Sequence, residues 1–173
     1  MSALPHPLRY TIADWEQWEG DWELWDGRPV AMSPSPRATH QELMLALAEI
    51  LRRGLRGTAG CTCRVFAELD WRVGNGTVFR PDLSVACREE VDEFLTEPPE
   101  LVIEILSPRT RENDRNGKRN RYSDLGVGNY FVIDPDDAQL ERLLGDAAGD
   151  DANHVTAELH DGCRLTLARR VQV

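Results

Sequence analysis

Glu104 is the residue whose position in this sequence points most clearly to chemistry. It lies in the middle of Leu-Val-Ile-Glu-Ile-Leu (101–106), where its neighbours on both faces of a predicted strand are aliphatic. Burying an unpaired carboxylate is strongly unfavourable, so this group must be protonated, paired with a cation or bound to a metal. A salt bridge to a buried Arg or Lys is the purely structural alternative.

Two further residues break the local pattern. Asp82 follows Pro81 inside another predicted strand, which indicates an edge, bulge or strand-start position, although a plain turn also explains a Pro-Asp pair. Lys118 shares one helical stripe with Tyr122 and Leu125, so it lies on or beside the inward face of its predicted helix. A lysine there can also extend along apolar surface to reach water.

Two carboxylates and one ammonium suit phosphodiester cleavage with a divalent metal. Carboxylate oxygens bind Mg²⁺ as a hard cation that keeps several of its waters. The metal polarises the phosphate and lowers the pKa of a water, and a nearby lysine orients that water and offsets developing negative charge. We therefore expect Asp82 and Glu104 on adjacent strands, at one end of a sheet.

The first part of the chain reads as a short helix, a hairpin and a long helix. The short helix is predicted within Thr11–Gly20, and the hairpin within Trp22–Met32 around Asp26-Gly27. Thr39 and Glu42 have the spacing of a capping box, and helical periodicity continues to Arg53, with Gly54 as the stop.

The rest of the chain alternates strands with one polar helix. We expect a long half-buried strand over Cys61–Val73, a second over Thr77–Cys87, a central strand over 101–106, a helix over about 114–125, a buried strand over 129–134, and three short antiparallel strands around 140–144, 155–159 and 164–173. The prediction is a single α/β (α+β-like) domain spanning 1–173. Its core covers about 39–135, its N-terminal helix and hairpin 11–32, and its C-terminal strands 138–173.

Composition narrows the class of protein. The chain has 173 residues, 41% hydrophobic and 29% charged, with a formal net charge of −10. These values are typical of a globular domain with a core of its own, and the acidic balance argues against nonspecific coating of nucleic acid. The N-terminal stretch lacks the pattern of a secretory signal, and no segment has the length of a membrane span.

The four cysteines lack the paired C-x-x-C spacing of structural zinc sites. We expect four reduced thiols, mostly buried, in a cytoplasmic protein, with metal binding or redox chemistry as the alternative.

Several segments together resemble one known family. FRPDLSV, PPELVIEILSPRT, the D-x-x-x-K-x-x-x-Y spacing of Asp114, Lys118 and Tyr122, and GVGNYFVIDP resemble the Uma-two family of restriction endonucleases, a branch of the PD-(D/E)xK nuclease superfamily. The upstream ELWDGRPVAMSPSPRATH is similar to the N-terminal hairpin and helix start of that family. The likeness spans roughly residues 11–135, and the ordered series is more specific than any single motif.

The resemblance implies a restriction-endonuclease-like core, a mixed sheet flanked by helices, with the site at one end. It implies that Asp82 and Glu104 bind Mg²⁺ or Mn²⁺, with the backbone carbonyl of Ile105 as a further ligand. The superfamily lysine two positions after the glutamate is absent, since Leu106 stands there, and Lys118 matches the lysine that fills this role from the following helix.

Three residues are accessory candidates in this resemblance. Glu42 could supply the extra acid that the first long helix often contributes, although a capping box already explains it. His40 matches a histidine at the helix start, where it could position metal or phosphate or simply bond the helix end. Tyr122 completes the helical motif.

Positive charge is concentrated beside the predicted site. Between residues 109 and 121 six basic side chains and two acidic ones give a net +4, while acid gathers toward both chain ends. A basic strip here could follow a phosphate backbone, or it could be a solvated helix face. The candidate nucleic-acid-binding residues are Arg109, Arg111, Arg115 and Arg119.

The leading hypothesis is therefore a Mg²⁺-dependent DNA endonuclease. One alternative is a catalytically inactive nuclease fold that serves as a binding or regulatory module, and another is a metal-dependent hydrolase of a different phosphoester. Cutting both DNA strands would favour a homodimer, and no membrane association is expected.

Overall fold

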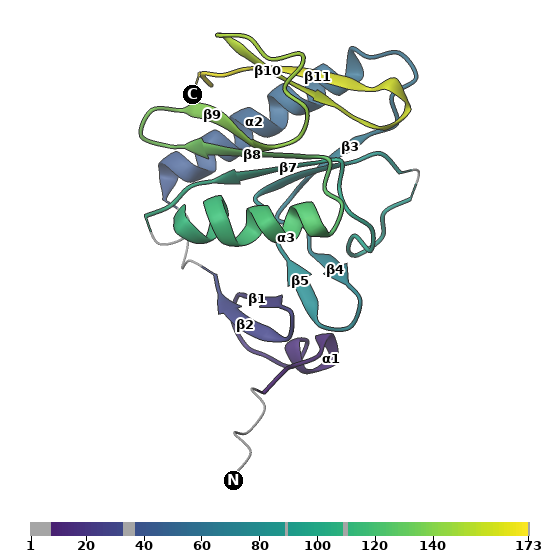
Figure 1. Cartoon of the computed structure of the whole chain (residues 1–173), viewed down its shortest axis with the longest axis vertical. Coiled ribbons are helices and arrows are strands. Elements are labelled where there is room, and N and C mark those ends of the chain that lie inside the picture. Colours follow the sequence, from purple (N-terminus) through teal and green to yellow (C-terminus); the bar gives the residue numbers. More distant parts are fainter. Residues whose placement is uncertain (1–7, 33–36, 89, 109–110, 173) are drawn as a thin grey trace.

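A five-stranded sheet forms the centre of the computed structural model, which describes residues 8–32, 37–88, 90–108 and 111–172 (Figure 1). In spatial order its strands are β3 (Arg64–Ala67), β6 (Leu83–Ala86), β7 (Leu101–Ile105), β8 (Asn129–Asp134) and β9 (Gln139–Leu144). β7 and β8 are parallel, and the other neighbouring pairs are antiparallel. The predicted mixed sheet of an α/β protein is confirmed.

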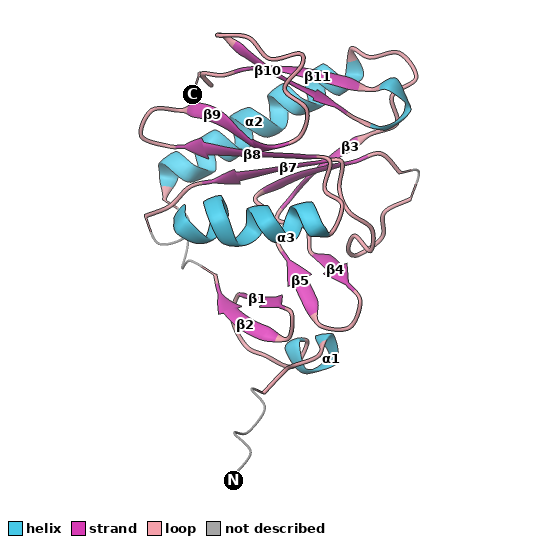
Figure 2. Cartoon of the chain, in the orientation of Figure 1, coloured by secondary structure: helices cyan, strands magenta, loops and turns pink. Residues whose placement is uncertain are grey.

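Different elements cover the two faces of this sheet (Figure 2). On one face lie α2 (Ala38–Arg56) and the hairpin of β10 (His154–Glu158) and β11 (Arg164–Ala168), which share one apolar cluster with the sheet. A 3₁₀ turn, η2 (His160–Gly162), connects the two hairpin strands. On the other face lie a π-helical turn, η1 (Asn113–Lys118), and α3 (Arg119–Asp124), over a cluster rich in aromatic rings.

A smaller sheet extends from this second face. Its strand order is β2 (Arg28–Ala31), β1 (Trp22–Trp25), β5 (Thr77–Phe79) and β4 (Trp71–Val73), and the short helix α1 (Ile12–Trp15) precedes it. The predicted hairpin is confirmed. Asp26 and Gly27 both have positive φ, 51° and 77°, as a two-residue type I′ turn requires. This hairpin carries β1 toward the end of the central sheet.

The two long strands predicted over 61–73 and 77–87 are wrong, because each is divided between the two sheets. Glu68 breaks the first with a φ of 51°, between β3 and β4. Pro81, which has no amide hydrogen to donate, lies in the break between β5 and β6. The amide of Glu68 donates to the carbonyl of Asp82, so the two breaks lie beside each other in the structure. Side-chain alternation alone does not reveal such a transfer between sheets.

Two predictions about α2 are also wrong. The helix begins at Ala38 after Arg37, with no side-chain cap, and it ends at Arg56, with Gly57 as its C-cap. Thr39 lies inside the first turn, so its hydroxyl does not cap the helix. Gly54 does not stop the helix. A Cβ there would lie 2.7 Å from Cδ2 of Leu165, so this glycine permits close packing against β11.

The remaining elements agree with the sequence. The predicted helix over 114–125 is present as η1 followed by α3, and the strand over 129–134 is β8. The three short antiparallel strands are β9, β10 and β11. Among the described residues, no helix combines the length and apolar character that a bilayer span requires.

The cysteines correct an expectation. In place of four reduced thiols, the structure has two disulfides, Cys61–Cys163 and Cys63–Cys87. The first joins the segment after α2 to the start of β11, and the second links the adjacent ends of β3 and β6. The partners are 102 and 24 positions apart, so their spacing in the sequence did not show the pairing.

Candidate active site

A pocket of about 570 Å³ lies where the C-terminal end of β7 meets the start of β6, the start of α2, β1 and η1. Side chains from all five segments line it, among them His40, Asp82, Glu104, Asp114 and Lys118. The pocket thus brings together residues that are far apart in the sequence.

Asp82 and Glu104 reach the pocket because β6 and β7 are adjacent and antiparallel. Leu83 pairs with Ile103, which places Asp82 opposite Glu104 one step further along the ladder. Asp82 Oδ2 accepts a hydrogen bond of 2.7 Å from the amide of Ile105. Its other oxygen, Oδ1, lies 3.3 Å from Nε2 of His40 at the start of α2. The carboxylate of Asp82 is therefore held between a strand and a helix.

Glu104 is buried, with 4% of its surface exposed, and two groups of the helical segment contact the same oxygen. Lys118 Nζ lies 2.8 Å from Glu104 Oε1, and the hydroxyl of Tyr122 donates to Oε1 at 2.9 Å. One helical turn separates these residues, so the stripe predicted from the sequence faces the sheet. The salt bridge to a buried cation, which the sequence left open as a structural role, is present.

Two more acids surround Lys118. Its ammonium lies 3.2 Å from Glu23 Oε1 and 3.6 Å from Asp114 Oδ1. Glu23 is oriented by the backbone amide of Arg80 at 2.8 Å and by the indole nitrogen of Trp25 at 3.0 Å. Both acids are buried, at 3% exposed. One ammonium therefore serves three buried carboxyl groups.

These surroundings shift the protonation of the central pair. Burial raises the pKa of Glu104 well above its usual range, and the charges of Asp82, Asp114 and Glu23 add to the effect while Lys118 opposes it. For Lys118, burial disfavours the charged form, but the acids around it outweigh burial and raise its pKa well above the usual range. The lysine therefore stays an ammonium, and the pKa of Glu104 is above its usual range despite this contact.

The two ring nitrogens of His40 have different surroundings. The hydrogen bond to Asp82 raises the pKa of its imidazole, with burial opposing the shift. Its Nδ1 is buried and, within the part of the chain that the structure describes, has no hydrogen-bond partner. A buried ring nitrogen without a partner suggests that a ligand or water completes this site.

The predicted nucleic-acid-binding arginines do not gather in one place. Arg111 lines the pocket and pairs with Asp134 at 2.6 Å. Arg115 pairs with Glu141, and Arg119 donates to the carbonyl of Leu143, so both contact β9 outside the pocket lining. Arg109 lies outside the described residues.

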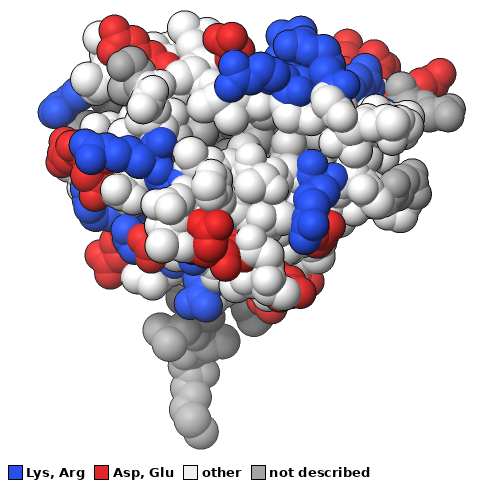
Figure 3. Space-filling model, turned by 90° about the horizontal axis from the view of Figure 1, so that it is seen from above, with Lys and Arg blue, Asp and Glu red and all other residues white. Residues whose placement is uncertain are grey.

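Basic and acidic side chains are interspersed on the face seen from above, over α2 and the C-terminal hairpin (Figure 3). The net negative charge of the chain is therefore not spread evenly over its surface, since this face carries basic as well as acidic side chains.

Of two other positions considered in the sequence, Glu42 lies away from the pocket and Leu106 lines it. Glu42 is exposed and does not line the pocket, and it belongs to no capping box. Leu106, at the position where the superfamily pattern has lysine, is 1% exposed and packs in the aromatic cluster with Tyr122.

Sequence reasoning missed Glu23, Asp114 and Arg37 as pocket residues. Arg37 lines the pocket mouth, is exposed, and forms no ion pair with the described residues. Lys118, the only lysine among the 20 basic residues of the sequence, lies in this buried cluster. The Asp114–Lys118 spacing of four also indicated a helical ion pair.

The donor set fits a hard divalent cation. Four carboxyl groups meet one ammonium and one imidazole, so acid outnumbers base two to one in a largely buried space. Within a strand, the N–H and C=O of one residue point to the same side, so the carbonyl of Ile105, like its amide, faces Asp82. Asp82, Glu104 and this carbonyl offer the oxygen ligands that Mg²⁺ and Mn²⁺ prefer.

Comparisons with known proteins agree with this architecture. No curated protein matches the sequence. Among solved structures, the fold is similar to the crystal structure of "a putative nuclease belonging to DUF820" from Anabaena variabilis, with a TM-score of 0.64 and 20% identity over 79% of this chain and 81% of that one. The likeness establishes the fold.

The family model supplies the assignment. The model of Uma2, described as "Putative restriction endonuclease", matches residues 10–168. That range includes all five segments that form the pocket. The resemblance to the Uma-two family seen in the sequence is confirmed, and the chain belongs to the Uma2 family.

Proposed function

We propose that this chain is a DNA endonuclease that hydrolyses phosphodiester bonds with Mg²⁺ or Mn²⁺ at the pocket. The observation that carries the proposal is the contact of Lys118 with Glu104, beside an Asp82 that is fixed by the amide of Ile105. Two carboxylates and an ammonium thus converge where oxygen ligands and a positive charge are both needed. Membership of a family described as "Putative restriction endonuclease" supports the same reaction class.

Asp82, Glu104 and the carbonyl of Ile105 are the proposed metal ligands. Lys118 and Tyr122 both contact Oε1 of Glu104, which leaves Oε2 for the metal among the described contacts. A bound Mg²⁺ would polarise the scissile phosphate and lower the pKa of a water. Asp82 uses Oδ2 for the Ile105 amide and has Oδ1 directed to His40, so metal binding replaces the histidine contact or shares that oxygen.

Lys118 is the proposed catalytic cation. The pKa of its ammonium is raised by the surrounding acids, so it acts as a charged donor at neutral pH and not as a base. It would orient the attacking water and stabilise negative charge on the phosphate oxygens. Tyr122 holds Glu104 in place, and His40, with a raised pKa beside Asp82, would donate a hydrogen bond to phosphate.

DNA contact is proposed at the pocket mouth. Arg37 is exposed and forms no ion pair with a described residue, and Arg111 also lines the pocket. Displacing Asp134 from Arg111 by a phosphate would exchange one ionic contact for another. Arg115 and Arg119 contact β9. In this proposal they contribute only through the electrostatic field of their positive charges and do not contact DNA directly. Because Arg37 and Arg111 would neutralise DNA phosphates and release their counterions, binding should weaken as the salt concentration rises.

The proposal includes an expected oligomeric state and an expected cellular location. Cleavage of both DNA strands would use a homodimer, with one pocket for each strand, and a cytoplasmic location would give access to DNA. Light scattering of the purified protein, with and without DNA, measures the first directly.

Supercoiled plasmid provides the test. With Mg²⁺ or Mn²⁺ the wild-type protein should convert it to nicked or linear form, and chelation by EDTA should stop the conversion. Ca²⁺, which binds oxygen ligands with different geometry, should support binding with little cleavage. Metal binding at the pocket with no cleavage of duplex, single-stranded or branched DNA would instead support the noncatalytic module. Hydrolysis of another phosphoester alone would support the third alternative.

A further inference from the structure

All four cysteines of the chain gather at the end of the central sheet opposite the pocket. Cys63 precedes β3 and Cys87 follows β6, and the pairing of Arg64 with Ala86 places these two cysteines beside each other. Cys61 lies two residues earlier, after α2, and Cys163 precedes β11. The pocket lies at the Glu104 end of β7, whereas this cluster lies at the end where β7 begins.

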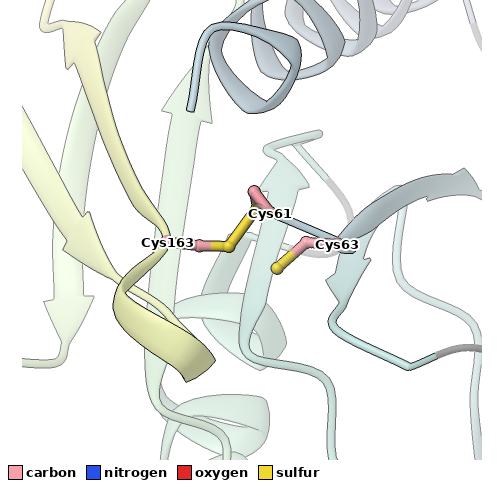
Figure 4. A group of neighbouring side chains, drawn as sticks. All are labelled: Cys61, Cys63 and Cys163. Carbon is pink, nitrogen blue, oxygen red and sulfur yellow. A yellow bond between two sulfur atoms is a disulfide. The ribbon is translucent and has the colours of Figure 1, made fainter. Parts of the chain in front are cut away.

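The sulfur atoms are closer together than two separate disulfides require. The Sγ atoms of Cys61, Cys63 and Cys163 all lie within 4.8 Å of one another, although Cys63 is bonded to Cys87 and not to the other two. Figure 4 shows Cys61 and Cys163 meeting, with Cys63 beside them. The sulfur of Cys87 adjoins this group through its bond to Cys63, although it does not lie within 4.8 Å of all three other sulfurs.

This spacing is suited to a tetrahedral thiolate site. With zinc–sulfur bonds of about 2.3 Å, sulfur atoms at the corners of a tetrahedron are about 3.8 Å apart. Among Cys61, Cys63 and Cys163, the sulfurs that are not bonded to each other lie within 4.8 Å, close to this spacing, and reduction would free the bonded pair to separate. Cys163 is 2% exposed and Cys63 8% exposed, so the site would be largely shielded from water.

We propose that the reduced chain binds one Zn²⁺ through Cys61, Cys63, Cys87 and Cys163, and that the two disulfides are the oxidised, metal-free state of the same four sulfurs. The segments that carry these cysteines are separate in sequence, and the ion would join them. Zinc would fix the C-terminal end of α2 to the β3–β6 edge and to the start of β11. His40 lies at the other end of α2, so the role proposed for zinc is structural and distinct from the chemistry at the pocket.

Electrons and protons balance in the conversion between the disulfide state and the zinc-bound state. A phosphine or dithiol reductant supplies two electrons to each disulfide, and with four protons in total the four cysteines become thiols. Binding of Zn²⁺ to four thiols then releases these four protons and leaves four thiolates on the metal. In the reverse direction a peroxide or disulfide oxidant removes four electrons in total, and the ion leaves as both disulfides form.

Native mass spectrometry of the full chain, kept under a phosphine reductant and supplied with Zn²⁺, tests the proposal. The expected result is about one zinc per chain, with a mass increase of one zinc ion less four protons. Cys163→Ser and Cys87→Ser should lose this species, and Asp82→Asn should keep it, because Asp82 belongs to the pocket. After oxidation with peroxide, the zinc should be absent and the mass should fall to that of the chain with two disulfides.

Cobalt provides a readout that needs no variant, in case a serine substitution prevents folding. The reduced wild-type chain with Co²⁺ should show thiolate-to-cobalt charge transfer and the visible bands of tetrahedral cobalt. A folded, reduced chain that binds no zinc would overturn the proposal, as would zinc that is lost in Asp82→Asn or a cobalt spectrum without thiolate bands. Failure of nuclease activity with intact zinc binding would reject only the proposed function.

Discussion

The carboxylate of Asp82 accepts a hydrogen bond of 2.7 Å from the backbone amide of Ile105, the residue after Glu104 on the neighbouring strand. This contact fixes one acid relative to the other through the backbone of the sheet and not through a flexible side chain. A rigid strand end is the kind of support that positions a functional group well. The pairing of β6 with β7 therefore defines the geometry of the site.

Lys118 should be essential for stability as well as for activity. Lys118→Met leaves three buried acids without their ammonium, and we expect a loss of about 3–5 kcal/mol in the free energy of unfolding. Glu104→Gln should also destabilise the chain. Because the two groups contact each other, the double variant should lose less than the two single losses combined.

Urea unfolding followed by circular dichroism measures this coupling. Asp124→Asn, which removes an exposed carboxyl near the end of α3, serves as the control and should change the free energy by less than about 0.5 kcal/mol. Strictly additive losses would show that the contact between Lys118 and Glu104 contributes nothing.

The single lysine makes its burial directly measurable. Lys118 is 6% exposed and its pKa is raised by the acids around it, so its amine is both shielded and protonated. Acetylation then requires local opening, and an opening cost of about 3 kcal/mol slows the reaction about 100-fold. Mass spectrometry of peptides from the treated chain should show slow acetylation of Lys118 in the folded protein and fast acetylation after unfolding in urea. Equal rates at Lys118 in the folded and unfolded protein would contradict the buried ion cluster.

Metal binding should strengthen as the pH rises. Burial raises the pKa of Glu104, so the metal-free site keeps a proton at pH values where an exposed glutamate is ionised. A metal binds the ionised carboxylate, and the proton must leave. Calorimetry with Mn²⁺ in two buffers of different ionisation enthalpy should therefore detect proton release, and the affinity should increase with pH until Glu104 is ionised in the free protein. Affinity that falls over the same pH range would contradict this assignment.

Two tyrosines provide a matched comparison. The hydroxyl of Tyr122 donates to Oε1 of Glu104 at 2.9 Å, and that of Tyr130 donates to the carbonyl of Asp114 at 2.8 Å. Each Tyr→Phe change removes one buried hydrogen bond and should cost about 1 kcal/mol. Only Tyr122→Phe should also lower Mn²⁺ affinity, by about 10-fold, because Tyr122 orients a proposed ligand. Equal effects of the two changes on Mn²⁺ affinity would reject that role.

The sequence predicts much of this site because the signals are local. A carboxylate within an aliphatic strand must find a cation, and Lys118 and Tyr122, four positions apart, turn one stripe toward it. The strand after Pro81 and the central strand are adjacent, which brings Asp82 and Glu104 to the same end. The resemblance to a nuclease family also assigns Asp82, Glu104 and Lys118 to one site.

Other features depend on distant contacts that no local pattern records. Glu23 joins the cluster because the β1–β2 hairpin folds back against η1, and its own strand gives no sign of this. Gly54 has the usual signal of a helix stop but serves close packing with Leu165. The expected capping box fails because the helix begins one residue earlier than Thr39. Glu68 adopts positive φ where alternation predicts a continuous strand.

The rate of plasmid nicking with Mg²⁺, compared between Asp82→Asn and Asp124→Asn, tests the central claim most directly. Both changes remove one carboxylate charge, but only the first lies in the pocket. Loss of a group that stabilises the transition state commonly costs about 100-fold or more in rate. We predict such a loss for Asp82→Asn and a wild-type rate for Asp124→Asn. Nicking that survives unchanged in Asp82→Asn would show that the metal site and its chemistry lie elsewhere.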